Sequence, residues 1–344
     1  MVHTSNADSK GFIVPNGLNL AVAYQKRDTS PMHTSATDTM PSFDRILVAT
    51  DFSTASQEAF RTGLDKCQSL GARLFILHVF EYAEPAPPET GGLLLELQVL
   101  RENCRESLEE LRQQAARAGV ECETILETGL APSVILDVIA ERGIDLAVLG
   151  TNPLHGFERL VFGSTAEAVL RKAPCPVLTA GPRVQRCATA CTTACPADGP
   201  IVFATDFDFT TIHAIRYAAC FANLSGSPIH CLHVLPRTLE AGTQSEIVPS
   251  IMAEALQQLA AESGVVIDPP TCATTFGSEI SYAVVDYARE HKAKLIVLGV
   301  RQASLLASHV PEHITYRIIT EANCPVLTMA FASHAGAVHA AARR

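Results

Sequence analysis

The fold is decided by a short stretch that occurs twice, as ILVATDF at Ile46–Phe52 and as IVFATDF at Ile201–Phe207. Each copy opens with consecutive apolar residues, a pattern typical of a strand that is buried on both faces. Each copy closes on Thr-Asp-Phe, so a hydroxyl and a carboxylate follow the strand directly. The pattern predicts the first strand of an α/β domain, with a polar loop after it.

The match between the two halves extends well beyond this stretch. Leu77-His78-Val79 recurs as Leu232-His233-Val234, and LAVLG at 146–150 recurs as LIVLG at 295–299. Near the end of each half, CPVLT at 175–179 recurs at 324–328. Several runs in the same order indicate two diverged copies of one domain, joined in tandem.

Strand-like and helix-like segments alternate within the first copy. Five buried strands are expected, at 46–50, 74–79, 123–126, 146–149 and 177–180. Amphipathic helices lie between them, one with Leu100, Cys104 and Leu108 at helical spacing. Thr54 is expected to cap the first helix together with Gln57, and Gly71, Gly119 and Gly143 to end helices. The alternation predicts an open, mainly parallel five-stranded sheet in each copy, with helices on both faces.

The remaining segments lack this periodicity. Residues 1–42 are expected to form a disordered extension, 182–198 a linker, and 332–344 a loose tail, which leaves two domains at 43–181 and 199–331.

Composition excludes several classes of protein. The chain has 344 residues and a formal net charge of −10, with no basic stripe of the kind that nucleic-acid binding requires. No apolar run is long enough to cross a membrane. Eleven cysteines, among them Cys67, Cys220 and Cys231 on apolar faces, are consistent with small hydrophobic side chains in a reducing cytoplasm.

Two loops have the chemistry of a ligand site. The first follows strand one and carries Thr50, Asp51 and Ser53; the second runs from Gly150 to Thr165. The second ends on Gly163-Ser164-Thr165 at an expected helix N-terminus, where free N–H groups favour an anion. Two structural alternatives stand beside this interpretation: Ser164 could cap its helix with Glu167, and Asp51 could tie down its turn.

Both copies resemble universal stress protein domains. The resemblance rests on Asp51 and Asp206, the Leu-His-Val strands, the glycine-spaced loop and the closing Cys-Pro-Val-Leu. It implies the strand order 3-2-1-4-5, which brings the loops after strands one and four together where the order reverses. It also implies pairing through the fifth strands, so Val177-Leu178 should meet Val326-Leu327 in an internal pseudo-dimer. A homodimer is left open.

The resemblance further implies a nucleotide site in the first copy. ATP-binding members carry Gly-x2-Gly-x9-Gly-Ser/Thr, which Gly150, Gly163 and Ser164 match, whereas Pro153 replaces the second glycine and removes a backbone donor. ATP, which Mg²⁺ can accompany, is the implied cofactor. Its base and ribose would contact Ala49, Thr50, Asp51 and Val79, its ribose also Gly150, and its phosphates Gly163, Ser164 and Thr165.

The second copy departs from this pattern. Gln302 stands at the second glycine position, and Glu312 and His313 replace the glycine and hydroxyl of the phosphate end. This copy is therefore expected to bind no nucleotide.

Further expectations concern histidines, cysteines and catalysis. His78 and His233 are interpreted as satisfied core residues, and the Cys187, Cys191 and Cys195 spacing fits no common zinc site. No nucleophile–base–orienter set is visible, so the chain is expected not to be an enzyme beyond slow incidental ATP hydrolysis. Two functions remain: an ATP-binding regulatory module in the stress response with an unnamed protein partner, or a stress-adaptation scaffold whose pockets are vestigial.

Overall fold

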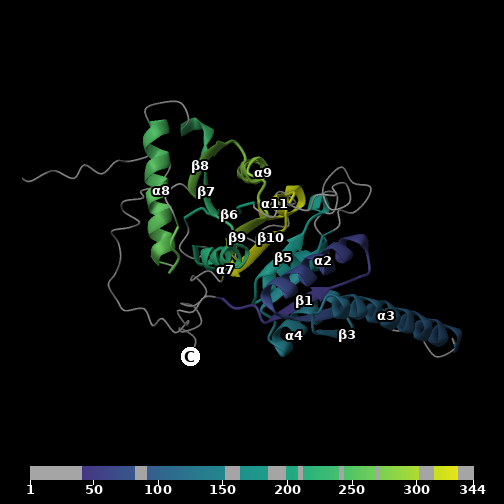
Figure 1. Ribbon diagram of the computed structural model, residues 1–344. Helices are drawn as coiled ribbons and strands as arrows, with labels where there is room; N and C mark the ends of the chain where they lie inside the picture. Colours follow the sequence, from purple (N-terminus) through teal and green to yellow (C-terminus); the bar gives the residue numbers. More distant parts are fainter. Residues whose placement is uncertain are drawn as a thin grey trace, which may run out of the picture. The chain divides into compact units, whose positions relative to one another are not determined.

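The computed structural model describes residues 41–81, 91–151, 163–184, 199–207, 212–239, 244–262, 264–267, 271–301 and 314–331. These residues belong to one compact unit, Met40–Arg344 (Figure 1). The expectations for the N-terminal extension, the linker cysteines and the tail lie outside the described residues.

Strands and helices alternate through the first repeat as expected. The elements are β1 (Arg45–Ala49), α2 (Thr54–Leu70), β2 (Arg73–Phe80), α3 (Gly91–Arg117), β3 (Cys122–Thr128), α4 (Ala131–Arg142), β4 (Leu146–Gly150), α5 (Ser164–Lys172) and β5 (Val177–Ala180).

The second repeat follows the same plan with two added 3-10 turns. Its elements are β6 (Ile201–Ala204), η1 (Ile212–Ala214), α7 (Ile215–Ser225), β7 (Ile229–Pro236), η2 (Arg237–Leu239), α8 (Gln244–Glu262), β8 (Cys272–Gly277), α9 (Ile280–Glu290), β9 (Leu295–Arg301), α11 (Ile314–Glu321) and β10 (Val326–Phe331).

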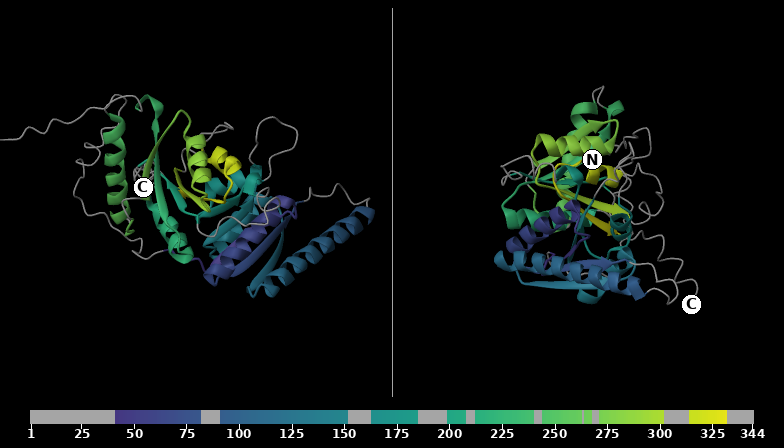
Figure 2. Two further views of the ribbon diagram at one scale, coloured as in Figure 1. Left: turned by 45° about the horizontal axis from the view of Figure 1, so that its top comes forward. Right: turned by 90° about the vertical axis from the view of Figure 1, so that its right-hand side faces the viewer.

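The ten strands form one sheet in the order β3-β2-β1-β4-β5-β10-β9-β6-β7-β8. Read outward from the middle, each half has the order 5-4-1-2-3, so the expected topology is confirmed. Strands within a half pair in parallel, and the two halves join through β5 and β10, which are antiparallel. The two five-stranded sheets are thus continuous (Figure 2).

The expected meeting of the fifth strands is confirmed in register. Leu178 pairs with Leu327, Thr179 with Val326, and Val177 with Thr328. The hydroxyl of Thr179 donates to the Val326 carbonyl at 3.1 Å, and that of Thr328 donates to the Val177 carbonyl at 3.2 Å. The pairing covers two strand edges that would otherwise expose unpaired backbone groups.

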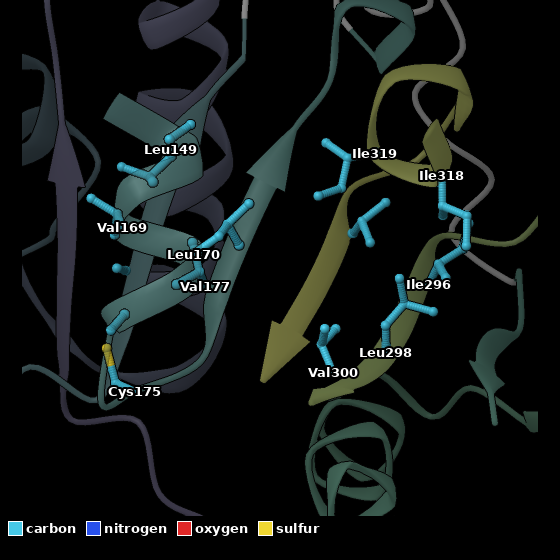
Figure 3. Close-up of a cluster of buried hydrophobic side chains, with 14 of the residues drawn as sticks. Leu149, Val169, Leu170, Cys175, Val177, Ile296, Leu298, Val300, Ile318 and Ile319 are labelled. Carbon is cyan, nitrogen blue, oxygen red and sulfur yellow. The ribbon is translucent and has the colours of Figure 1, made fainter. Parts of the chain in front are cut away.

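The hydrophobic core continues across this seam on both faces of the sheet. Leu47 belongs to one buried cluster, while its neighbours Ile46 and Val48 belong to the other, because alternate side chains on a strand face opposite ways. Each cluster draws residues from both repeats. Figure 3 shows Val177 on one side of the seam and Ile296 and Ile319 on the other. The repeats therefore share their core.

Helix ends confirm one expectation and correct another. Gly71, Gly119 and Gly143 have φ values of 67°, 75° and 57°, the left-handed conformation that ends helices. The expected cap Thr54 is wrong: it is the first helical residue, and Ser53 is the N-cap, with extended backbone and a side chain that accepts from the Ser56 N–H.

None of the described helices is long and apolar enough to cross a membrane.

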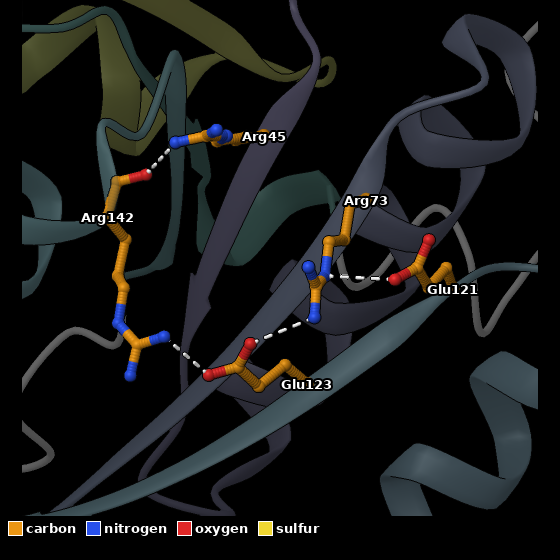
Figure 4. Close-up of polar contacts among 5 residues, drawn as sticks. All are labelled: Arg45, Arg73, Glu121, Glu123 and Arg142. Atoms are coloured by element: carbon orange, nitrogen blue, oxygen red, sulfur yellow. Dashed lines mark hydrogen bonds and ion pairs between the residues drawn. The ribbon is translucent and has the colours of Figure 1, made fainter.

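Ion pairs gather where the strands of the first repeat begin. Arg73 pairs with Glu121 and Glu123, at 3.3 and 3.0 Å, and Arg142 pairs with Glu123 at 2.7 Å (Figure 4). Arg45 donates to the Arg142 carbonyl at 2.7 Å. Such solvated pairs add at most about 1 kcal/mol each. With each of these cations paired to a carboxylate or a carbonyl, the network ties the strand starts together.

Candidate functional site

The turn after β1 is built around the buried Thr50. Its N–H donates to the Leu77 carbonyl at 2.8 Å, which fixes the end of β1 against β2. Its hydroxyl accepts from the Phe52 N–H at 3.0 Å and donates to the Ser56 hydroxyl at 3.0 Å, so one side chain links the turn to α2. The chain then reverses through Phe52, whose φ is 62°. A left-handed phenylalanine is strained, and such strain is concentrated at functional sites.

Asp51 lies between these two residues and is exposed. Partial burial acts to raise the pKa of its carboxyl, but hydrogen bonds from Ser53 and Ser56 outweigh it and hold the pKa below its ordinary value. The Ser53 N–H and hydroxyl donate to Oδ1 at 3.0 and 2.6 Å. Asp51 therefore ties down its turn, and it also presents a fixed negative charge at the carboxyl end of the sheet.

The second repeat builds the same turn. Phe207 has a φ of 63°, and its N–H donates to the Thr205 hydroxyl at 3.1 Å. The Thr205 N–H donates to the Leu232 carbonyl at 3.0 Å. His233 matches His78, since each Nδ1–H donates to the threonine carbonyl at 2.8 Å. Burial lowers the pKa of His233, against the raising effects of that bond and of Asp206. Both histidines are hydrogen-bonded as expected, but both are only partly buried, so their interpretation as core residues is wrong.

Two glycines flank the second candidate loop, and they differ in how closely the surrounding atoms approach them. A Cβ on Gly150 would lie 2.2 Å from the Ala55 carbonyl oxygen, so β4 approaches the start of α2 only because this residue is glycine. A Cβ on Gly163 would meet no atom of the described residues within 4 Å, and the φ of Gly163 is −61°, which any residue adopts. Packing explains the first glycine, whereas packing against the described part of the chain does not explain the second.

The start of α5 does not have the capping box that was the structural alternative for Ser164. Gly163 is the N-cap, and it makes no side-chain cap hydrogen bond to this helix. Ser164 is the first helical residue and is exposed, while Glu167 forms an ion pair with Arg171. The capping-box interpretation of Ser164 and Glu167 is therefore wrong, because the helix begins at Ser164, one residue earlier than that box requires.

Two hollows lie beside the turn after β1. One, of about 350 Å³, is lined by Val79, Leu100 and Cys104, and the other, of about 330 Å³, by Thr50 and Arg61. Phe52 lines both. Leu100 was expected on the buried face of its helix, yet its side chain is 51% exposed beside the first hollow. An apolar wall at the carboxyl end of a parallel strand suits a flat, uncharged ring system.

A thiol and an imidazole meet in the first of these hollows. Cys104 Sγ lies 3.4 Å from His78 Nε2, although the residues are 26 positions apart. The His78 ring packs against Phe52 with ring centres 4.4 Å apart. The sequence shows no nucleophile–base–orienter set, because the contact depends on how α3 is rotated over the sheet; the helical spacing of Cys104 was its only signal.

The structure brings together one part of the expected site. Ala49, Thr50 and Asp51 end β1, Val79 lies on the neighbouring β2, and Gly150 ends β4 on the other side, with Val48 paired to Val148. Gly163, Ser164 and Thr165 begin α5 and line neither hollow.

Several residues of the expected site lie outside the described residues. They are Pro153, Gln302, Glu312 and His313. Within the second repeat, Ile314, the first residue of α11, stands where Thr165 stands in the first, so one hydroxyl of the phosphate end is replaced by an apolar side chain. Among the described residues, no group of three or more His, Cys, Asp or Glu could hold a metal ion.

The contrast between the two glycines predicts opposite effects of the same small substitution. Gly150→Ala should destabilise the fold by about 1–3 kcal/mol, the usual cost of overpacking, because the new methyl group meets a backbone carbonyl. Gly163→Ala should change the free energy of unfolding by no more than about 0.5 kcal/mol. Urea unfolding of both variants measures the difference, and equal costs would contradict it.

A model of the universal stress protein family matches the chain twice, at residues 42–180 and 199–329. Relatives in the curated collection match one repeat at a time. A universal stress protein of Thermus aquaticus is 34% identical over 138 residues, which cover 40% of this chain and 97% of that protein. One of Methanocaldococcus jannaschii is 29% identical over 137 residues, covering 40% and 81%.

Solved structures share the tandem arrangement. A universal stress protein from Archaeoglobus fulgidus superposes with a TM-score of 0.63 at 19% identity, covering 83% of this chain and 98% of its own. A protein of unknown function from Pseudomonas aeruginosa gives a TM-score of 0.53 at 19% identity, covering 86% and 95%. At this identity the likeness concerns the fold alone.

Proposed function

The chain belongs to the universal stress protein family, and on that premise we propose that it is an ATP-binding regulatory module of the stress response. The nucleotide is held by the first repeat alone. ATP occupancy biases the conformation of that repeat or its affinity for a protein partner, and the chain has no catalytic role beyond slow hydrolysis.

Gly163 carries this proposal. Within the described part of the chain, neither packing nor backbone conformation requires a glycine there, and as N-cap it gives the first N–H groups of its helix no side-chain partner. Close approach of a ligand to the backbone is a remaining reason for glycine at such a position. A phosphate group is the ligand that a helix N-terminus with Ser164 and Thr165 favours.

The base and ribose of ATP would lie against residues at or just after the ends of β1 and β2. Phe52, Val79 and Leu100 offer apolar surface for a base, and Asp51 lies next to Phe52 with its charge fixed by hydrogen bonds. Thr50 and Ala49 reach the same edge from β1, and Gly150 from β4. These residues would hold the base and ribose, and Gly163, Ser164 and Thr165 the phosphates, with Mg²⁺ as a counterion.

Mass spectrometry of nucleotide extracted from the purified protein tests this function. The proposal predicts ATP in an amount no greater than that of the protein chain. Extraction of no nucleotide, together with no binding of added ATP, would instead support the scaffold function with vestigial pockets. Pro153 is the sequence feature that favours this alternative, because it removes a backbone donor from the loop. Added ATP should be hydrolysed slowly, because no residue is assigned as a base for an attacking water.

A further inference from the structure

The contact between Cys104 and His78 has the geometry of a reactive thiol. His78 Nδ1–H donates to the Thr50 carbonyl at 2.8 Å, so in the neutral ring Nε2 carries the lone pair. That lone pair lies 3.4 Å from Cys104 Sγ and accepts a hydrogen bond from the thiol. A nucleophile, a base and a carbonyl that orients the base are thus linked by two consecutive hydrogen bonds.

The position of the pair makes the thiol accessible. Cys104 and His78 both line the 350 Å³ hollow beside Phe52, and neither side chain is fully buried. Cys67 and Cys175 are buried, and burial raises the pKa of each thiol to about 12. Desolvation also raises the pKa of Cys104, so the resting pair is a neutral thiol donating to an imidazole. Reaction of Cys104 therefore depends on proton transfer to His78.

We propose that Cys104 is a site of covalent modification by hydroperoxides, with His78 as the base that accepts its proton. Sγ attacks the hydroxyl oxygen of the peroxide, and an S–O bond forms as the O–O bond breaks. The thiol proton passes through His78 Nε2 to the departing oxygen, which leaves as water from hydrogen peroxide or as an alcohol from an organic hydroperoxide. The sulfur is oxidised by two electrons to a sulfenic acid, and the peroxide is reduced.

The modification has a consequence for ligand binding, and this consequence rests on the proposed function. An oxygen on Sγ places a polar group in the wall that faces the nucleotide base. Oxidised protein therefore binds ATP more weakly, and bound ATP shields Cys104 from the peroxide. The site couples an oxidant to nucleotide occupancy in the first repeat.

The second repeat supplies a matched control. His233 makes the same bond to the Thr205 carbonyl and packs against Phe207 with ring centres 4.6 Å apart. No thiol lies beside its Nε2 among the described residues. The two histidines thus share a structural role, and only His78 adds the thiol contact.

The test exposes the full chain to hydrogen peroxide, traps sulfenic acid with dimedone and quantifies each cysteine by peptide mass spectrometry. His78→Asn should slow trapping at Cys104 at least tenfold, whereas His233→Asn leaves it unchanged, because general-base assistance is typically worth about 10²–10⁴. Trapping at Cys272 and Cys220 should not change in either variant. If H78N fails to fold, His78→Gln carries the same comparison.

Equal trapping at Cys104 in the parent and H78N, or none in the parent, overturns the proposal. An ATP arm separates it from the proposed function. Trapping that depends on His78 but is unaffected by saturating ATP supports the thiol site and contradicts nucleotide binding in this hollow. Trapping that ATP slows, but that proceeds at the same rate in the parent and H78N without ATP, supports nucleotide binding and overturns the role of His78.

Discussion

Gly163→Glu is expected to lower the affinity for ATP at least a hundredfold while leaving the fold intact. The new carboxylate would lie beside the phosphates, and a like-charge contact at about 4 Å costs about 4 kcal/mol at an effective dielectric near 20. A loss of 1.4 kcal/mol already weakens binding tenfold. The fold is expected to tolerate the change because a Cβ at Gly163 meets no atom of the described residues within 4 Å.

Gly163→Gln is the matched control, since its side chain has the same shape without the charge. A smaller loss in G163Q than in G163E assigns the effect to electrostatic repulsion of the phosphates. Equal losses would assign it to blocked backbone approach. Calorimetric titration with ATP measures both variants, and urea unfolding checks their stability. ATP binding by G163E at the parent affinity would place the phosphates elsewhere.

Leu178→Ala is expected to destabilise both repeats together, by about 2–5 kcal/mol. Leu178 is fully buried and pairs with Leu327 across the seam between β5 and β10. It belongs to a core cluster that also contains Ile201 and Phe203 of the second repeat. Removal of its side chain leaves a cavity that both repeats line, so one cooperative unfolding transition should shift.

Leu224→Ala is the control for this experiment, because Leu224 is 48% exposed and its removal should cost no more than about 0.5 kcal/mol. Leu178→Ala and Leu327→Ala combined should depart from additivity, since the two residues are in contact. Two separate urea transitions, of which L178A shifts only the first, would show that the repeats unfold independently and would contradict a shared core.

The sequence predicts the architecture well because the architecture depends on repeated, strongly buried segments. Consecutive apolar residues at Ile46–Ala49 and Leu146–Leu149 have few alternatives to a buried parallel strand, and the matching segments of the second repeat confirm each assignment. The pairing of Leu178 with Leu327 followed from the family resemblance, which supplies an edge-to-edge contact that local pattern does not encode.

The local errors arise where several neighbouring residues offer the same chemistry. Ser53, Thr54 and Ser56 all carry hydroxyls, and the hydrogen bonds of Asp51 decide which of them caps α2. The contact between Cys104 and His78 depends on the rotation of a helix over the sheet, which spacing alone does not give. The recurrence of Thr-Asp-Phe in both repeats marked Phe52 as a residue of interest. Its left-handed backbone could not be predicted, because it accompanies the hydrogen bond from the Phe52 N–H to the Thr50 hydroxyl.

Calorimetric titration of the full chain with ATP tests the central claim most directly. Both repeats end their first strand in the same turn, around Thr50 and Thr205, but only the first keeps glycine and hydroxyl residues at the start of the helix that follows its fourth strand. One ATP per chain is the predicted stoichiometry, and Gly163→Glu should remove it. Two equivalent sites per chain, or a single site that survives Gly163→Glu, would contradict it.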